Sequence, residues 1–208
     1  MLLSCLTLTN AVYNDMVILP IPENMNSGKS HTYFSWAALN AWVPPIYNAT
    51  LPSPTYTYSN ASSIPPRLAA HDPKQAWTDI LSGNAAHWVH PDYVVKVDDD
   101  AFVMLAELEG RLRVEIDHWR TLNPTQDPLI YWGYLITNRL HQFMAGELYA
   151  LSFALVDWVS KDERLKAMTR GAEDKQTAKW MRIHPQANQI RWSSERCWIY
   201  DHPRAGTV

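Results

Sequence analysis

The sequence predicts an α/β protein with a mixed central sheet and flanking helices, and three observations lead to that prediction. Short apolar segments rich in β-branched residues alternate with longer segments whose apolar residues recur at helical spacing. Hydrophobic residues make up 47% of the 208-residue chain and charged residues 19%, a balance typical of folded globular proteins. A run of three aspartates directly follows one apolar segment, where α/β sheets bind ligands. We expect a single domain over residues 1–208.

The first part of the chain is predicted to contain two strands, two helices and a long loop. Residues 1–8 are apolar but too few to span a bilayer, so we expect a core strand there. Residues 15–20 are a short apolar segment that ends at a proline and are a second predicted strand. An apolar face predicts a helix over residues 31–43. Prolines among Ser, Thr and Asn predict a loop over residues 44–72, and a helix that begins with proline is predicted over residues 73–81.

The remaining part alternates strands and helices. The predicted strands, each rich in β-branched or aromatic residues, cover residues 93–97, 129–136 and 147–151, with short extended segments at 189–192 and 197–200. The predicted helices cover residues 103–113, 153–158 and 173–181. This alternation is typical of α/β proteins.

Composition limits the kinds of partner. The net charge of −3 gives no broad electrostatic support for binding to nucleic acid or to an anionic membrane. Ten Trp and ten Tyr fit core packing and also fit a sugar or nucleotide site. The two cysteines, Cys5 and Cys197, could pair or stay free, and their spacing does not decide between these states. N-glycosylation sequons at Asn48 and Asn60 are compatible with a secretory lumen.

The three adjacent aspartates, Asp98, Asp99 and Asp100, are the most informative feature of the sequence. Carboxylates this close repel one another unless a positive charge lies among them, and a hard divalent cation bound through oxygen is the usual solution. The alternative is an acidic turn in solvent or a helix N-cap. The position of the run directly after a strand favours the metal site.

Glu173 and Asp174 form a second acidic pair, at the start of a predicted helix. Ordinary capping explains them, because the helix dipole favours negative charge there. The functional interpretation is a carboxylate that takes a proton from an acceptor hydroxyl. A metal site with a separate base is the minimum set for transferring a sugar from a nucleotide-sugar, because the cation neutralises the leaving diphosphate and the base activates the nucleophile.

Three segments, in order, resemble glycosyltransferase family 31, the group of β-1,3-galactosyltransferases and N-acetylglucosaminyltransferases. Residues 96–102 (KVDDDAF) resemble its K-x-DDD-x-F segment. Residues 146–152 (GELYALS) resemble its G-x-x-Y-x-x-S block, and Glu173-Asp174 resembles its E-D-V block. The resemblance covers roughly residues 13–203.

This resemblance implies a GT-A fold, in which a Rossmann-like nucleotide-binding half is joined to an acceptor half. It also implies a UDP-sugar donor, Mn²⁺ (with Mg²⁺ as the other choice) and inversion at the anomeric carbon. The resemblance implies nucleotide-sugar binding by Lys96, Asp98, Asp99 and Gly146, with a structural role as the alternative for Lys96. It implies metal binding by the outer members of a D-x-D motif, Asp98 and Asp100, with His202 or His184 as a late ligand. It implies general base catalysis by Asp174, with Glu173 either positioning Asp174 or contacting the acceptor.

The leading prediction is a metal-dependent inverting glycosyltransferase that moves a hexose, expected to be galactose, from a UDP-sugar to a hydroxyl of a glycan or glycoprotein. The family's arginine-rich first strand and its membrane anchor have no counterpart here. The resemblance therefore implies a chain truncated at both ends, from a type II membrane protein of the Golgi lumen. One alternative is a relative that keeps the fold as a binding module with impaired catalysis. Another is a metal-dependent enzyme acting on phosphate esters.

Overall fold

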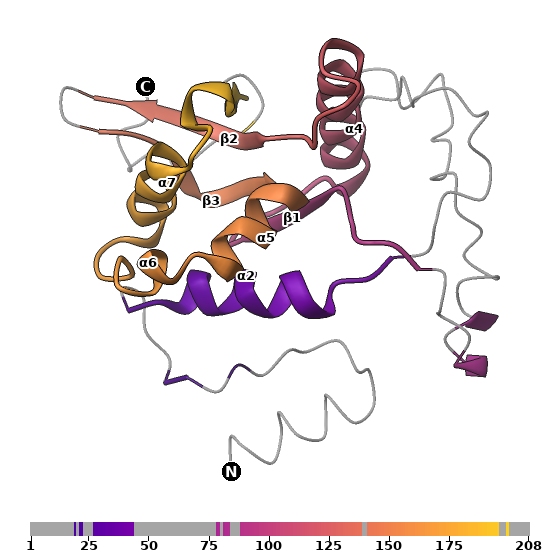
Figure 1. The fold of residues 1–208 in the computed structure, drawn as a ribbon, viewed down its shortest axis with the longest axis horizontal. Coiled ribbons are helices and arrows are strands. Elements are labelled where there is room, and N and C mark those ends of the chain that lie inside the picture. Colours follow the sequence, from indigo (N-terminus) through magenta and orange to yellow (C-terminus); the bar gives the residue numbers. More distant parts are fainter. Residues whose placement is uncertain are drawn as a thin grey trace.

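The computed structural model describes residues 19, 21–22, 27–43, 78–79, 81–83, 88–138, 141–195 and 199 (Figure 1). In order along the chain, the helices and strands are α2 (Lys29–Asn40), β1 (Tyr93–Val97), α4 (Leu105–Leu122), β2 (Ile130–Thr137), β3 (Gln142–Ser152), α5 (Phe153–Lys161), α6 (Glu163–Lys166), α7 (Glu173–Ile183), the short 3-10 helix η2 (Ala187–Gln189) and β4 (Arg191–Ser194). The predicted α/β class, with a mixed sheet and flanking helices, is confirmed for this part of the chain.

Strands β3 and β2 form the centre of the sheet, because each pairs with a neighbour on both sides. The strand order is β1-β3-β2-β4. Strand β3 runs antiparallel to both β1 and β2, while β4 pairs parallel to β2. Strands β1, β2 and β4 therefore point the same way. Their sequences are rich in Val, Ile, Tyr and Trp, which suit a pleated and largely buried surface.

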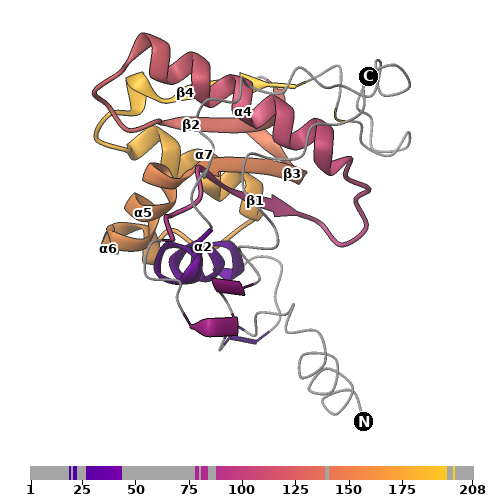
Figure 2. The ribbon, with the colours of Figure 1, turned by 90° about the vertical axis from the view of Figure 1, so that its right-hand side faces the viewer.

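Side chains that alternate along the strands divide the core between two layers of helices. Tyr149 of β3 faces α7, where its hydroxyl bonds Glu173. Trp132 of β2 points to the opposite face, where its indole N–H donates to Glu195 at 3.3 Å, and Glu195 also accepts from Arg111 of α4. Figure 2 shows α4 in front of the sheet and α7 behind it. None of the helices described here is long and apolar enough to cross a membrane.

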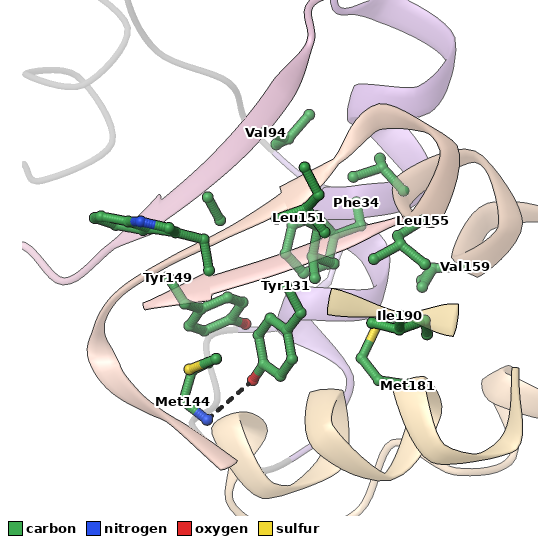
Figure 3. Packing of buried hydrophobic residues seen from close by; sticks show 14 of the residues in the cluster. Phe34, Val94, Tyr131, Met144, Tyr149, Leu151, Leu155, Val159, Met181 and Ile190 are labelled. Carbon is green, nitrogen blue, oxygen red and sulfur yellow. Dashed lines mark hydrogen bonds between the residues drawn. The ribbon is translucent and has the colours of Figure 1, made fainter. Parts of the chain in front are cut away.

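Aromatic rings fill the layer between the sheet and helices α2, α5 and α7 (Figure 3). The ring of Tyr149 lies 5.8 Å from Tyr131, edge to face, and 6.2 Å from Phe34 of α2. All three side chains are fully buried, and each such burial is worth about 1.5–3 kcal/mol. The buried Tyr131 hydroxyl accepts the Met144 N–H at 3.3 Å, so this polar group does not go unpaired.

Helix α4 and strand β3 exceed their predicted lengths by the most residues. Helix α4 continues past residue 113 to Leu122, because Ile116 and Trp119 keep the helical spacing of its buried residues. Strand β3 begins at Gln142, five residues before the predicted start, because its first part forms a hairpin with the end of β2.

Several predicted segments lie almost entirely outside the described residues. They are the strands at 1–8 and 15–20, the loop at 44–72, the helix at 73–81 and the extended segment at 197–200. Cys5 and Cys197 lie there too. The prediction of a single domain over residues 1–208 stays a prediction.

Buried Ser152 ties the end of β3 to the start of β2. Its hydroxyl donates to the Pro128 carbonyl at 2.6 Å and accepts the Ile130 N–H at 3.0 Å. The residue is 1% exposed. The serine of the G-x-x-Y-x-x-S block is therefore a structural residue in this chain.

We expect Ser152→Ala to lower the free energy of unfolding by about 1–3 kcal/mol, because it leaves buried backbone groups unpaired. Urea denaturation measures the loss. Ser160→Ala is the matched control, because the Ser160 hydroxyl donates only to a carbonyl of its own helix, that of Asp157. Equal effects of the two substitutions would contradict the structural role of Ser152.

Candidate active site

Strand β1 aims Lys96 and Asp98 at the same face of the sheet, because side chains two residues apart share a face. The register of β1 with β3 places Lys96 opposite Tyr149. Pairing continues one residue beyond β1, where the Asp98 N–H donates to the Glu147 carbonyl at 3.0 Å. The sheet therefore holds the first aspartate of the acidic run in place.

The ammonium group of Lys96 lies at the centre of the site. It contacts the Asp98 carboxylate and the Gly146 carbonyl, and it lies 3.0 Å from Glu173 Oε1. Burial by itself would lower the pKa of Lys96, but the bonds to Asp98 and Glu173 outweigh it and raise the pKa. Lys96 therefore stays charged, and it joins the turn after β1 to the start of α7.

Glu173, the first residue of α7, is held by donors from three other elements. Its Oε2 accepts the Tyr149 hydroxyl of β3 at 2.6 Å and the Ser30 hydroxyl of α2 at 2.9 Å. Its Oε1 faces Lys96 of β1. This carboxylate therefore fixes the start of α7 against the sheet and against α2.

Two glycines make this close approach possible. A β-carbon at Gly146 would lie 3.3 Å from Glu173 Oε1 and 3.8 Å from Lys96 Nζ, so a side chain there would crowd the ion pair. Gly171, two residues before α7, has a φ of +110°, in the left-handed region that favours glycine. A β-carbon there would meet the Gln176 side chain at 2.7 Å.

Asp174 lies beside this cluster, and its carboxylate is partly buried. Its Oδ1 accepts the Lys175 N–H at 2.6 Å. Burial, together with the neighbouring charge of Glu173, raises the pKa of Asp174, although the Lys175 backbone, the Lys175 charge and Lys96 oppose the rise. A carboxylate with a raised pKa suits a general base, because its basicity moves toward the working pH.

The other two aspartates of the acidic run, Asp99 and Asp100, are exposed on the turn that follows β1. In the described part of the chain, no three His, Cys, Asp or Glu side chains converge as a metal-binding group. The donor set of the turn consists of carboxylate oxygens, which suit a hard cation such as Mn²⁺ or Mg²⁺. The carboxylates of Asp98 and Asp100 are therefore chemically suitable as two ligands for such an ion, and both come from the same turn.

The late histidines do not add a third ligand among the described residues. His202 lies outside them. His184 follows the last residue of α7, about 15 Å along the helix from Asp174, and its ring packs edge-on against Trp158 at 4.6 Å. His184 is therefore far from the acidic run.

The structure brings together the three sequence segments that carry the predicted site residues. Lys96 and Asp98 of the first segment, Gly146 of the second, and Glu173 and Asp174 of the third meet on one face of the sheet. Their individual roles stay predictions.

Sequence reasoning missed two members of the cluster. Ser30 lies far away in the sequence, on α2, and no local signal pointed to it. Tyr149 stands in a matching block, and its position opposite Lys96 follows from the β1–β3 register, which sequence alone does not provide.

Comparisons with known proteins point to one distant relative. No protein-family profile matches the chain. The chain is 26% identical over 202 residues to the β-1,3-galactosyltransferase pvg3 of Schizosaccharomyces pombe, an alignment that covers 91% of this chain and 48% of that protein. The chain thus spans about half the length of this curated relative. The similarity supports a galactosyltransferase-like relationship at the family level, and the mixed α/β fold is compatible with it.

We expect Asp174→Asn to stabilise the protein at neutral pH. Because the folded pKa of Asp174 is raised, the folded state binds more protons than the unfolded state between the two pKa values. The wild-type protein therefore loses stability as the pH rises through that window, because Asp174 must ionise in the folded state. Asparagine cannot ionise, so the Asp174→Asn variant is more stable than the wild type at neutral pH. This advantage vanishes below the unfolded pKa of about 4. Urea unfolding from about pH 3 to about pH 8, a range that begins below the unfolded pKa, measures the difference.

Asp162→Asn serves as a control of opposite sign. The hydrogen bond from the Arg164 side chain lowers the pKa of Asp162, so its ionised form favours the folded state. The substitution at residue 162 should give no gain at neutral pH. A loss of stability for Asp174→Asn at neutral pH would rule out a raised pKa in the folded chain.

Proposed function

We propose that this chain carries the donor-binding and base-bearing parts of a glycosyltransferase related to the β-1,3-galactosyltransferases. The transferred sugar would be a hexose, with galactose as the first choice, moved from a UDP-sugar to a hydroxyl of a glycan or glycoprotein. The observation that carries the proposal is the meeting of Lys96, Asp98 and Glu173, from two distant acidic segments, beside Gly146 and Asp174. The similarity to a β-1,3-galactosyltransferase over most of the chain supports it.

The two acidic segments have different proposed roles, donor binding and proton transfer. Asp98, Asp99 and Gly146, around the turn after β1, form the proposed side for the nucleotide-sugar. Asp174, at the start of α7, is the proposed general base. Both oxygens of Glu173 are engaged by protein donors, which supports the choice of Asp174 over its neighbour.

The proposed cation is Mn²⁺ or Mg²⁺, held by Asp98 and Asp100, with His202 as a further candidate ligand. When bound, such an ion neutralises the negative charge that develops on the departing diphosphate. The oxygen-only donor set of the acidic turn supports a hard cation.

The proposed reaction is a direct displacement with inversion. Asp174 accepts the proton of the acceptor hydroxyl while that oxygen forms a bond to the anomeric carbon. The bond from the anomeric carbon to the diphosphate oxygen breaks on the opposite side, and its electron pair leaves with UDP. The raised pKa of Asp174 supports this role, since proton transfer is most efficient when the base is matched to the working pH.

One exposed aromatic ring follows the acidic turn. Phe102, two residues after Asp100, is 92% exposed. Exposed aromatic rings suit the apolar faces of sugars and bases.

We further propose a GT-A arrangement of the whole domain, and a setting in the Golgi lumen as part of a type II membrane protein. These two proposals follow from the resemblance to glycosyltransferase family 31, and the similarity to a galactosyltransferase supports that resemblance.

We expect Asp174→Asn to lower kcat for transfer by about 10²–10⁴-fold, because it removes the base and keeps the side-chain shape. The measurement is UDP release from a panel of UDP-sugars with glycan acceptors and Mn²⁺. Asp157→Asn, which alters a carboxylate on α5 paired with Lys161, is the control and should keep full activity. Full turnover by the Asp174 variant would exclude this residue as the base.

We expect Asp100→Asn to weaken UDP binding in the presence of Mn²⁺, because it removes a metal ligand. A chelator should weaken binding of UDP to the wild-type chain in the same way. Isothermal titration calorimetry with UDP, with and without Mn²⁺, measures both effects. Equal UDP affinity with and without Mn²⁺ would contradict the metal site, and no UDP binding at all would favour a non-catalytic relative.

A further inference from the structure

The protein itself surrounds the Lys96 ammonium group. Lys96 donates to Asp98 Oδ1 and to the Gly146 carbonyl, and it forms an ion pair with Glu173 Oε1 at 3.0 Å, so three protein oxygens lie around its three N–H groups. Its side chain is 17% exposed, so the group is also largely shielded from solvent. The sequence left two roles open for Lys96, binding of the nucleotide-sugar and a structural role. These contacts favour the role inside the protein.

Glu173 is likewise engaged by protein groups. Its two oxygens receive three donors, from Lys96, Tyr149 and Ser30. Its side chain is 24% exposed. The glutamate therefore transmits the position of Lys96 to the start of α7, where Asp174 is the next residue.

The direction of the Tyr149 hydrogen bond follows from its surroundings. Burial, with Glu173 close by, raises the pKa of Tyr149 well above its ordinary value, so the phenol keeps its proton. That proton goes to Glu173 at 2.6 Å, because a carboxylate can only accept. The Thr177 hydroxyl, 3.2 Å from the Tyr149 oxygen and 3.0 Å from the Glu173 carbonyl, braces the same turn of α7.

We propose that Lys96, Tyr149 and Ser30 are positioning residues that set the place of Asp174 relative to the donor-binding turn, acting through Glu173 and without touching the substrate. The proposal rests on the transferase function put forward above and deepens it. Lys96 bridges the turn at Asp98 to Glu173, while Tyr149 and Ser30 keep the Glu173 carboxylate turned toward the lysine. The base and the donor site are thereby joined by one ion pair.

A pair of matched tyrosine substitutions tests the proposal. Tyr149→Phe removes the hydroxyl that holds Glu173, and Tyr131→Phe removes an equally buried hydroxyl that instead accepts from the Met144 backbone. We expect Tyr149→Phe to lower kcat by about 10- to 100-fold, with the KM for the UDP-sugar little changed. Tyr131→Phe should keep kcat. Equal losses of kcat in the two variants would overturn the proposal.

Lys96 variants separate positioning from substrate binding. We expect Lys96→Met to lower kcat, and Tyr149→Phe to add little in the Lys96→Met background, because Lys96 and the Tyr149 hydroxyl both position Asp174 through Glu173. Lys96→Arg, which can still bridge two carboxylates, should restore part of the rate. Independent, multiplying losses would overturn the proposal. A raised KM for the UDP-sugar with unchanged kcat would do so too, because it would indicate direct contact with the donor.

A measurement without turnover separates failure of this inference from failure of the proposed function. Urea midpoints are compared for Tyr149→Phe, Glu173→Gln and the double variant, and for the same cycle with Tyr131→Phe. We expect non-additive shifts in the first cycle and additive shifts in the second. Additive shifts in both, with turnover by the wild type, would overturn the positioning role alone. Coupling without any turnover of the UDP-sugar panel would overturn the transferase function and the positioning role with it.

Discussion

The ion pair between Lys96 and Glu173 is the contact on which the whole candidate site depends. It joins the acidic turn after β1 to the first residue of α7, two segments that are far apart in the sequence. A largely buried ammonium group stays charged only when acceptors surround it, and here two carboxylates and a carbonyl do so. Removing Lys96 would leave Glu173 without its opposite charge, and removing Glu173 would leave Lys96 with Asp98 as its one charged partner among these contacts.

The same contact explains how several carboxylates can lie close together. Asp98 and Glu173 share one cation, and Glu173 also receives two hydroxyl donors, so the repulsion between acids is reduced at both ends. Asp174 receives less of this support, and burial raises its pKa. Two adjacent acidic residues at one helix terminus thereby acquire different properties: Glu173 is held by several protein donors, and Asp174 has a raised pKa, which suits its proposed role as a base.

The β1–β3 register and the glycine at residue 146 make this arrangement possible. Lys96 lies directly opposite Tyr149, so the lysine and the tyrosine hydroxyl approach Glu173 from the same face of the sheet. The absence of a side chain at Gly146 lets α7 come close. The third member of the matching block, Ser152, serves the fold instead, since it joins the ends of β2 and β3.

The sequence alone determined the α/β class, because apolar period and β-branched content are local properties, and it also singled out both acidic segments. It placed strand β1 correctly but underestimated α4 and β3, since hairpin pairing and a continued buried face depend on partners outside each segment. Only the tertiary structure decided that Lys96 faces Glu173, that Ser30 belongs to the site and that His184 does not. Those facts depend on strand register and helix packing, which bring together residues that no local pattern connects.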